Sequence, residues 1–61
     1  MTIRDLRTTA HMTQKTFAEY FGIPKRTVED WETGRRECTP YLLDLIAYKL
    51  QKEGLIPDDA P

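Results

Sequence analysis

Apolar residues along the chain recur every three or four positions, and this spacing predicts amphipathic helices rather than strands. The first predicted helix covers residues 2–10 and opens at Thr2. The second covers residues 14–21 and is capped by Thr13, whose hydroxyl oxygen can accept from a free backbone N–H. The side chains expected on the buried faces are Ile3, Leu6 and Ala10 in the first helix, and Phe17, Ala18 and Phe21 in the second.

The third predicted helix begins at Pro24, whose preset φ suits a first helical residue, and it reaches about Thr33. Gly34 follows and can adopt the left-handed conformation that ends many helices. Only Gly22 and Ile23 separate this helix from the one before it, so the two helices must cross steeply. Gly22 can supply the positive φ that such a turn needs. Two short helices joined in this way are typical of a helix-turn-helix.

The fourth predicted helix carries apolar residues on two nearly opposite faces. It has Thr39 as cap and Pro40 as first residue, and it runs to about Lys52, before Gly54. One face is the expected core stripe of Leu43, Ile46, Ala47 and Leu50. The other, called the tyrosine face below, comprises Tyr41, Leu42, Leu45 and Tyr48. An exposed apolar stripe indicates an interface with a second copy or another protein, unless both tyrosines lie flat over the edge of the core.

The chain has 61 residues, enough for one small domain with a marginal core. Since every predicted element is helical, we expect an all-α fold, a compact domain of four or five helices over residues 1–54. Residues 55–61 contain two prolines and two aspartates and are expected to form a short tail. No stretch approaches the roughly 18 apolar residues of a membrane span, and the start lacks the pattern of a secretory signal. We therefore expect a cytoplasmic protein with no membrane contact.

Charge is distributed unevenly along the chain. The net charge of −1 does not by itself indicate a nucleic-acid partner. Residues 1–36, however, hold seven basic and five acidic side chains, whereas residues 37–61 hold two basic and five acidic ones. A molecule with this asymmetry can present one basic face to a polyanion.

The sequence offers little for catalysis or metal binding. One histidine, His11, and one cysteine, Cys38, exclude an internal disulfide and a thiolate–imidazole metal site. His11 is expected on the surface at a helix end, and Cys38 is expected to be inert in a loop. Since nothing places a base beside a nucleophile, we expect no enzyme activity, no cofactor and no metal.

Residues 13–34 read TQKTFAEYFGIPKRTVEDWETG and resemble the DNA-binding domain of the phage repressor and Cro family, the xenobiotic-response-element type of bacterial regulator. The matching features are Thr13-Gln14, Phe17-Ala18-Glu19, Phe21-Gly22-Ile23, Thr27-Val28, Trp31-Glu32-x-Gly34 and Arg35-Arg36. The likeness covers about residues 3–50. It implies a lambda-repressor-like fold and sequence-specific binding of double-stranded DNA by a small regulator that acts as a repressor. The family usually has Ser or Thr where Pro24 stands, and Pro24 can only preset φ.

The resemblance also implies roles for individual side chains. The base-reading candidates lie on the third helix and are Lys25, Arg26, Glu29 and Asp30. Lysine or arginine can donate to guanine, and glutamate can accept from cytosine. The candidates for phosphate contacts are Gln14, Lys15, Thr27, Arg35 and Arg36. Arg7 and Glu32 are expected to form a structural ion pair, and Trp31 is expected in the core. The plain alternative for the charged residues is a solvated helix face and a solubilising loop.

Two further functions stay open. The tyrosine face and the acidic tail could hold a partner protein, as in the antitoxin of a toxin–antitoxin pair. Alternatively, Glu29 and Asp30 could mark a helix-turn-helix that no longer binds DNA. In the leading interpretation the chain forms a homodimer, at least on DNA, with its recognition helices about 34 Å apart.

Overall fold

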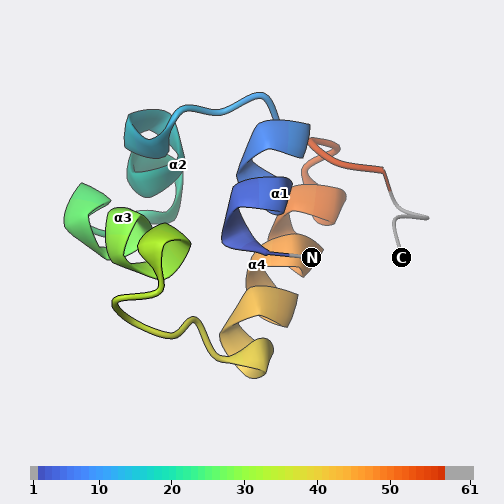
Figure 1. Ribbon diagram of the computed structural model, residues 1–61. Coiled ribbons are helices and arrows are strands. Elements are labelled where there is room, and N and C mark those ends of the chain that lie inside the picture. The colour runs from blue at the N-terminus through green and yellow to red at the C-terminus, as the bar shows by residue number, and fades with distance from the viewer. Residues whose placement is uncertain (1, 58–61) are drawn as a thin grey trace.

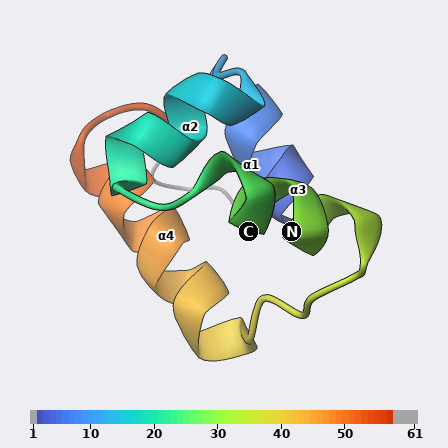
Figure 2. The ribbon, with the colours of Figure 1, turned by 90° about the vertical axis from the view of Figure 1, so that its left-hand side faces the viewer.

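The computed structural model describes residues 2–57, and these residues form four helices and no strand. The helices are α1 (Ile3–Thr9), α2 (Gln14–Phe21), α3 (Lys25–Thr33) and α4 (Pro40–Lys52). Figures 1 and 2 show α2 and α3 on one side of the molecule, with α1 and α4 forming the rest of it. The all-α prediction is confirmed. None of these helices is both long enough and apolar enough to cross a membrane.

Threonine side chains cap three of the four helices. Thr2 opens α1 with a capping box, in which its hydroxyl oxygen accepts from the Asp5 N–H (3.1 Å) and the Asp5 carboxylate accepts from the Thr2 N–H (3.0 Å). Thr13 and Thr16 form the equivalent box at the start of α2, and Thr39 caps α4. These caps satisfy backbone donors that the first turn of a helix leaves free, so they determine where each helix begins.

The start of α3 differs from the prediction by one residue. The sequence predicts Pro24 as the first helical residue, but its ψ of 140° is extended and the helix begins at Lys25. Pro24 is therefore the N-cap. It has no side-chain donor or acceptor, so the first turn of α3 has no side-chain cap.

All four helices contribute to a single apolar core. The buried residues are Ile3, Leu6, Ala10, Phe17, Ala18, Val28, Ile46, Leu50 and Ile56. From the predicted core stripe of α4, Ile46 and Leu50 are buried, while Leu43 and Ala47 are half-buried and pack against the core. The core therefore joins α1 and α4 to the pair formed by α2 and α3.

Two residues just after the predicted end of the domain contact the core. The sequence predicts a tail from residue 55, yet Ile56 is buried and Leu55 packs against the core. Gly54 has a φ of +75°, and the N–H of Leu55 donates to the carbonyl of Leu50 (2.8 Å), so the chain turns back over the end of α4. Residues 58–61 of the predicted tail lie outside the described residues.

Candidate nucleic-acid interface

The turn between α2 and α3 determines the direction of α3. Gly22 ends α2 with a φ of +68°, and the N–H of Ile23 donates to the carbonyl of Ala18 (3.0 Å). Phe17 and Val28 are fully buried on the inner faces of the two helices, and Ala18 is buried beside them. Because the inner face of α3 is held in this way, its outer face is presented to solvent as one rigid surface.

The four base-reading candidates form two ion pairs along α3. Lys25 Nζ lies 3.5 Å from Glu29 Oε2, and Arg26 Nε lies 3.5 Å from Asp30 Oδ1. Each pair spans one helical turn, which is the spacing at which side chains of a helix meet. Lys25 and Arg26 have well-exposed side chains and Glu29 is 40% exposed, whereas Asp30 is only 13% exposed. The structure therefore gathers all four on the outer side of α3 but leaves Asp30 mostly covered.

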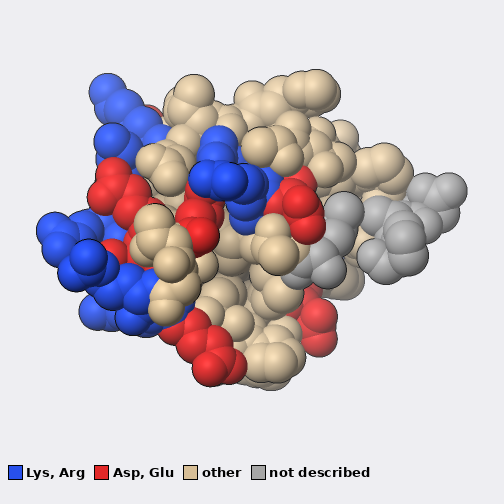
Figure 3. Space-filling view, viewed as in Figure 1, with Lys and Arg blue, Asp and Glu red and all other residues tan. Residues whose placement is uncertain are grey.

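Basic side chains gather beside this helix. In Figure 3 the lysine and arginine side chains are concentrated on the side where Figure 1 places α2 and α3, with acidic side chains between them. Lys15 is exposed on the first turn of α2, and Arg35 and Arg36 are exposed in the loop that follows α3. This side of the molecule suits a polyanion although the whole chain is slightly acidic.

Two of the phosphate candidates are less accessible. Thr27 is half-buried, and Gln14 is half-buried with its Nε2 donating to Glu32 Oε1 (3.3 Å). A glutamine amide has two N–H donors, so one remains for an anion when the other binds Glu32. Sequence reasoning missed this link because nothing in the order of residues shows that Gln14 and Glu32 face each other.

Glu32 is the centre of an ion cluster that joins three helices. Its side chain is 1% exposed and accepts two hydrogen bonds from Arg7, at 2.7 Å from Nε and 3.0 Å from Nη2. Arg7 Nη1 also donates to the carbonyl of Met12 (3.0 Å), and Arg4 Nε lies 3.4 Å from the same carboxylate. The structure thus brings the expected Arg7–Glu32 pair together and adds Arg4. Arg4 lies one turn before Arg7 on the same face of α1, and this spacing could have predicted its contact with Glu32.

The hydrogen bonds from Arg7 are the main cause of the shifted pKa of Glu32. They lower the pKa of the Glu32 carboxyl, more than burial raises it, and Gln14 and Arg4 lower it further. The same bonds raise the pKa of Arg7. Both groups are therefore ionised near neutral pH, and a bidentate pair of this kind fixes the orientation of α1 relative to α3.

Comparison of the sequence with models of known families identifies the family to which this arrangement of helices belongs. A model of a helix-turn-helix family matches residues 3–53, which is most of the chain. The chain belongs to the phage repressor and Cro-like helix-turn-helix family. No curated protein and no solved structure matches it. Proteins of this family are DNA-binding regulators, and α2 and α3 are the two helices of the motif.

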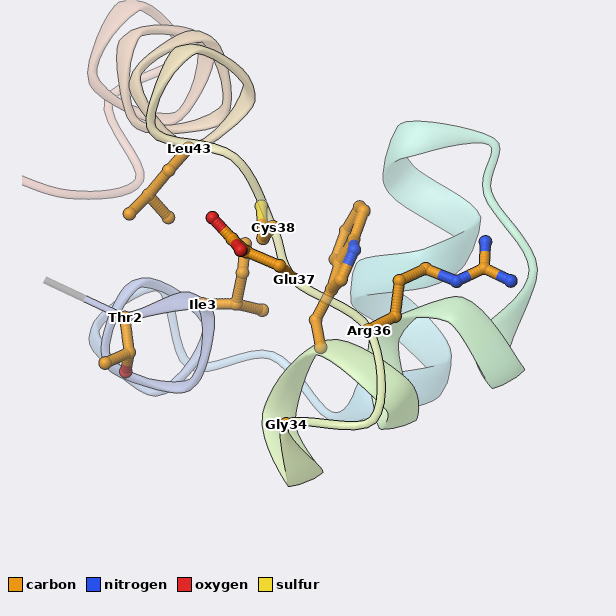
Figure 4. A pocket seen from close by; sticks show the side chains of 8 residues that line it. Thr2, Ile3, Gly34, Arg36, Glu37, Cys38 and Leu43 are labelled. Carbon is orange, nitrogen blue, oxygen red and sulfur yellow. The ribbon is translucent and has the colours of Figure 1, made fainter.

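Near the end of the helix-turn-helix, an open pocket of about 380 Å³ lies between α1, α3 and α4. Trp31 lines it and is half-buried against the core, so its indole is part of the packing. Ile3, Leu43 and Cys38 also line it, and burial raises the pKa of the Cys38 thiol, which keeps the thiol neutral and weakly reactive. Figure 4 shows Arg36 pointing away from Ile3 and Leu43, out of the pocket.

Within residues 2–57, no group of three or more His, Cys, Asp or Glu side chains is placed to hold a metal ion. His11 is exposed just after α1, with a φ of +60°.

The tyrosine face of α4 is open to solvent over most of its area. Tyr41 is 76% exposed, Tyr48 60% and Leu45 47%, and these are the large apolar side chains most exposed in the described chain. These values disagree with the alternative in which the tyrosines lie flat over the core. Leu42 differs from the other three, since it is half-buried and packs against the core. The exposed part of the tyrosine face is therefore Tyr41, Leu45 and Tyr48.

Proposed function

We propose that this chain binds a specific double-stranded DNA sequence with α3 in the major groove and acts in the cytoplasm as a transcriptional repressor. The observation that carries the proposal is the outer face of α3. Lys25 and Arg26 are exposed on its first turn, while Val28 is fully buried behind them. A rigid helix with cations at its exposed N-terminal end has the shape and the donors needed to read base edges.

The contacts divide by chemistry. Lys25 and Arg26 donate to guanine O6 and N7, and Glu29 accepts from a cytosine amino group. Contacts to phosphate come from Lys15, Arg35 and Arg36, which are exposed on the same side of the molecule, with additional donors on Gln14 and Thr27. Phosphate contacts set the register of the protein on DNA, and base contacts select the sequence. Repression follows from occupancy, since a bound repressor prevents polymerase from using the same site.

A second copy of the chain is the proposed occupant of the tyrosine face. One helix-turn-helix reads only a few base pairs, and a twofold dimer reads two half-sites about 34 Å apart, which is one turn of DNA. The exposure of Tyr41, Leu45 and Tyr48 on one side of α4 supports this pairing.

Selection of binding sites from a random duplex library tests the proposal. We expect enrichment of an inverted repeat with half-site centres about 10 base pairs apart, bound much more tightly at about 50 mM than at 200 mM salt. The absence of any enriched sequence would contradict sequence-specific binding and favour a helix-turn-helix that has lost this activity.

Charge reversal on α3 tests which helix reads the DNA. Lys25→Glu should weaken binding to the selected duplex by about tenfold or more, because a donor to a base edge is replaced by an acceptor that repels phosphate. Lys52→Glu makes the same chemical change at an exposed position of α4 and is the matched control. Equal losses in the two variants, measured by fluorescence anisotropy, would show that only net charge matters.

The second candidate function is the binding of a partner protein, as by an antitoxin, and the exposed tyrosine face favours it. The two candidates differ in what covers this face. A chain that stays monomeric at high concentration and on the selected duplex would point to a different protein as the occupant.

A further inference from the structure

Asp30 is covered, although it lies among exposed side chains. Its neighbours on the outer side of α3 have side-chain exposures of 40% for Glu29 and 73% for Arg26, against 13% for Asp30. Two guanidinium groups approach the same carboxylate oxygen, Oδ1. Arg26 Nε lies 3.5 Å away, from one turn earlier in α3, and Arg35 Nε lies 3.9 Å away, from the loop after the helix.

The backbone of the same residue holds the loop. The carbonyl of Asp30 accepts a hydrogen bond from the N–H of Arg36 (3.1 Å), so the loop turns back over the last turn of α3. The same turn of the loop places Arg35 Nε 3.9 Å from the carboxylate. Asp30 therefore contacts both the first turn of the helix and the segment that follows it.

This arrangement is poorly suited to direct base reading by Asp30. The Asp30 side chain is only 13% exposed and two guanidiniums approach its Oδ1, so little of the carboxylate is left for a cytosine amino group. Together, Arg26, Asp30 and Arg35 carry a net positive charge with the cations outermost. Exposed ion pairs add little to stability. The main effect of the Asp30 carboxylate is therefore on the orientation of the Arg26 and Arg35 side chains.

We infer that Asp30 is a positioning residue, whose carboxylate holds Arg26 against a base and Arg35 against the neighbouring phosphate, and that Asp30 itself reads no base. The part of this inference that concerns DNA rests on the proposed function. The part that concerns the arginines applies to the free protein.

The free protein provides the first test. Side-chain NMR of the arginine Nε–Hε groups would compare the wild type with Asp30→Asn and with Glu29→Gln, which removes the same charge from the same face. In Asp30→Asn the Nε–Hε groups of both Arg26 and Arg35 should shift and become more mobile, and in Glu29→Gln neither should change. Unchanged Arg26 and Arg35 signals in Asp30→Asn would overturn the inference without any reference to DNA.

A double-mutant cycle on the selected duplex provides the second test. Asp30→Asn should reduce discrimination at the base pair contacted by Arg26 by about tenfold, and it should have little further effect once Arg26→Gln is present. Comparison with Glu19→Gln, which removes the same charge from an exposed position of α2 outside the proposed contacts, accounts for the general gain in affinity that follows the loss of a negative charge. A change of preference at a base pair that Arg26→Gln leaves unaffected would show that Asp30 reads a base, and would overturn the inference. If the wild type selects no duplex, the proposed function fails, while the NMR result still decides the role of Asp30.

Discussion

At the scale of single residues, Glu32 determines how the helix-turn-helix is attached to α1. Its carboxylate is almost completely buried and receives hydrogen bonds from Arg7 on α1 and Gln14 on α2. A buried ion pair adds little net stability when it is complete, but the loss of one partner leaves a charge without compensation. The pair therefore acts mainly on geometry, since its two hydrogen bonds restrain the orientation of α1 relative to α3.

Arg7→Ala should destabilise the domain by about 3 kcal/mol, because it leaves the Glu32 carboxylate buried without its main partner. Arg4→Ala is the control, since Arg4 contacts the same carboxylate from an exposed position where an ion pair contributes about 0.5 kcal/mol. Chemical denaturation measures both. Similar losses in the two variants would contradict a dominant role for the Arg7 bonds.

The lowered pKa of Glu32 predicts that stability falls in acid. Because the folded-state pKa is below the ordinary value of 4.5, the contribution of Glu32 is complete above that value and is lost as the pH falls through the folded pKa. The pKa of Asp5 is also lowered, by its hydrogen bonds from Thr2, so it acts in the same direction. Melting temperatures between pH 7 and pH 2 should decline in this window, and less steeply for Glu32→Gln. An equal decline in that variant would assign the effect to other carboxyls.

At the scale of secondary-structure elements, α4 depends on the segment that follows it. Lys49 Nζ lies 5.3 Å from the centroid of the Tyr20 ring, which links the helix to α2 at its surface. The deeper link is Ile56, which packs in the core after the turn at Gly54. Residues that resemble a tail in composition thus complete the packing of the last helix.

Ile56→Ala should therefore destabilise the domain by about 3 kcal/mol, the usual cost of truncating a buried isoleucine. Leu45→Ala is the matched control, because it removes a similar side chain from the exposed side of α4 and should change the stability of the monomer little. Thermal melting at low protein concentration separates the two. A small effect of Ile56→Ala would place the end of the domain before residue 56.

At the scale of the whole molecule, the two binding functions that we propose belong to two different surfaces. The basic side over α2 and α3 meets DNA, and the tyrosine face of α4 meets a second copy. Both proposed surfaces lie on the same small core. The area that three side chains can bury is modest, which favours a dimer that forms mainly on DNA, where two half-sites hold the copies together.

Leu45→Glu should prevent two copies from binding together to the inverted repeat, because it places a charge at the centre of the tyrosine face. Binding of one copy to a single half-site should remain. Lys52→Gln lowers the net charge by the same amount at the far end of α4 and should bind as the wild type does. Sedimentation velocity with the duplex measures the stoichiometry, and two copies of Leu45→Glu on one repeat would contradict the proposed interface.

The sequence by itself determined the local features of this protein. Helical spacing, threonine caps and a glycine between two short helices predicted the four helices and the helix-turn-helix, because each depends on residues within a few positions of one another. The first residue of α3 was misplaced by one, since a proline suits both the cap and the first helical position.

Only the tertiary structure decided which distant residues meet. It showed that Arg35 as well as Arg26 approaches the Asp30 carboxylate, that Gln14 and Arg4 join Glu32, and that Ile56 is in the core. It also separated Leu42, which packs inward, from the rest of the tyrosine face. The physical reason is that burial and charge pairing depend on how helices pack in three dimensions, whereas periodicity describes one helix at a time.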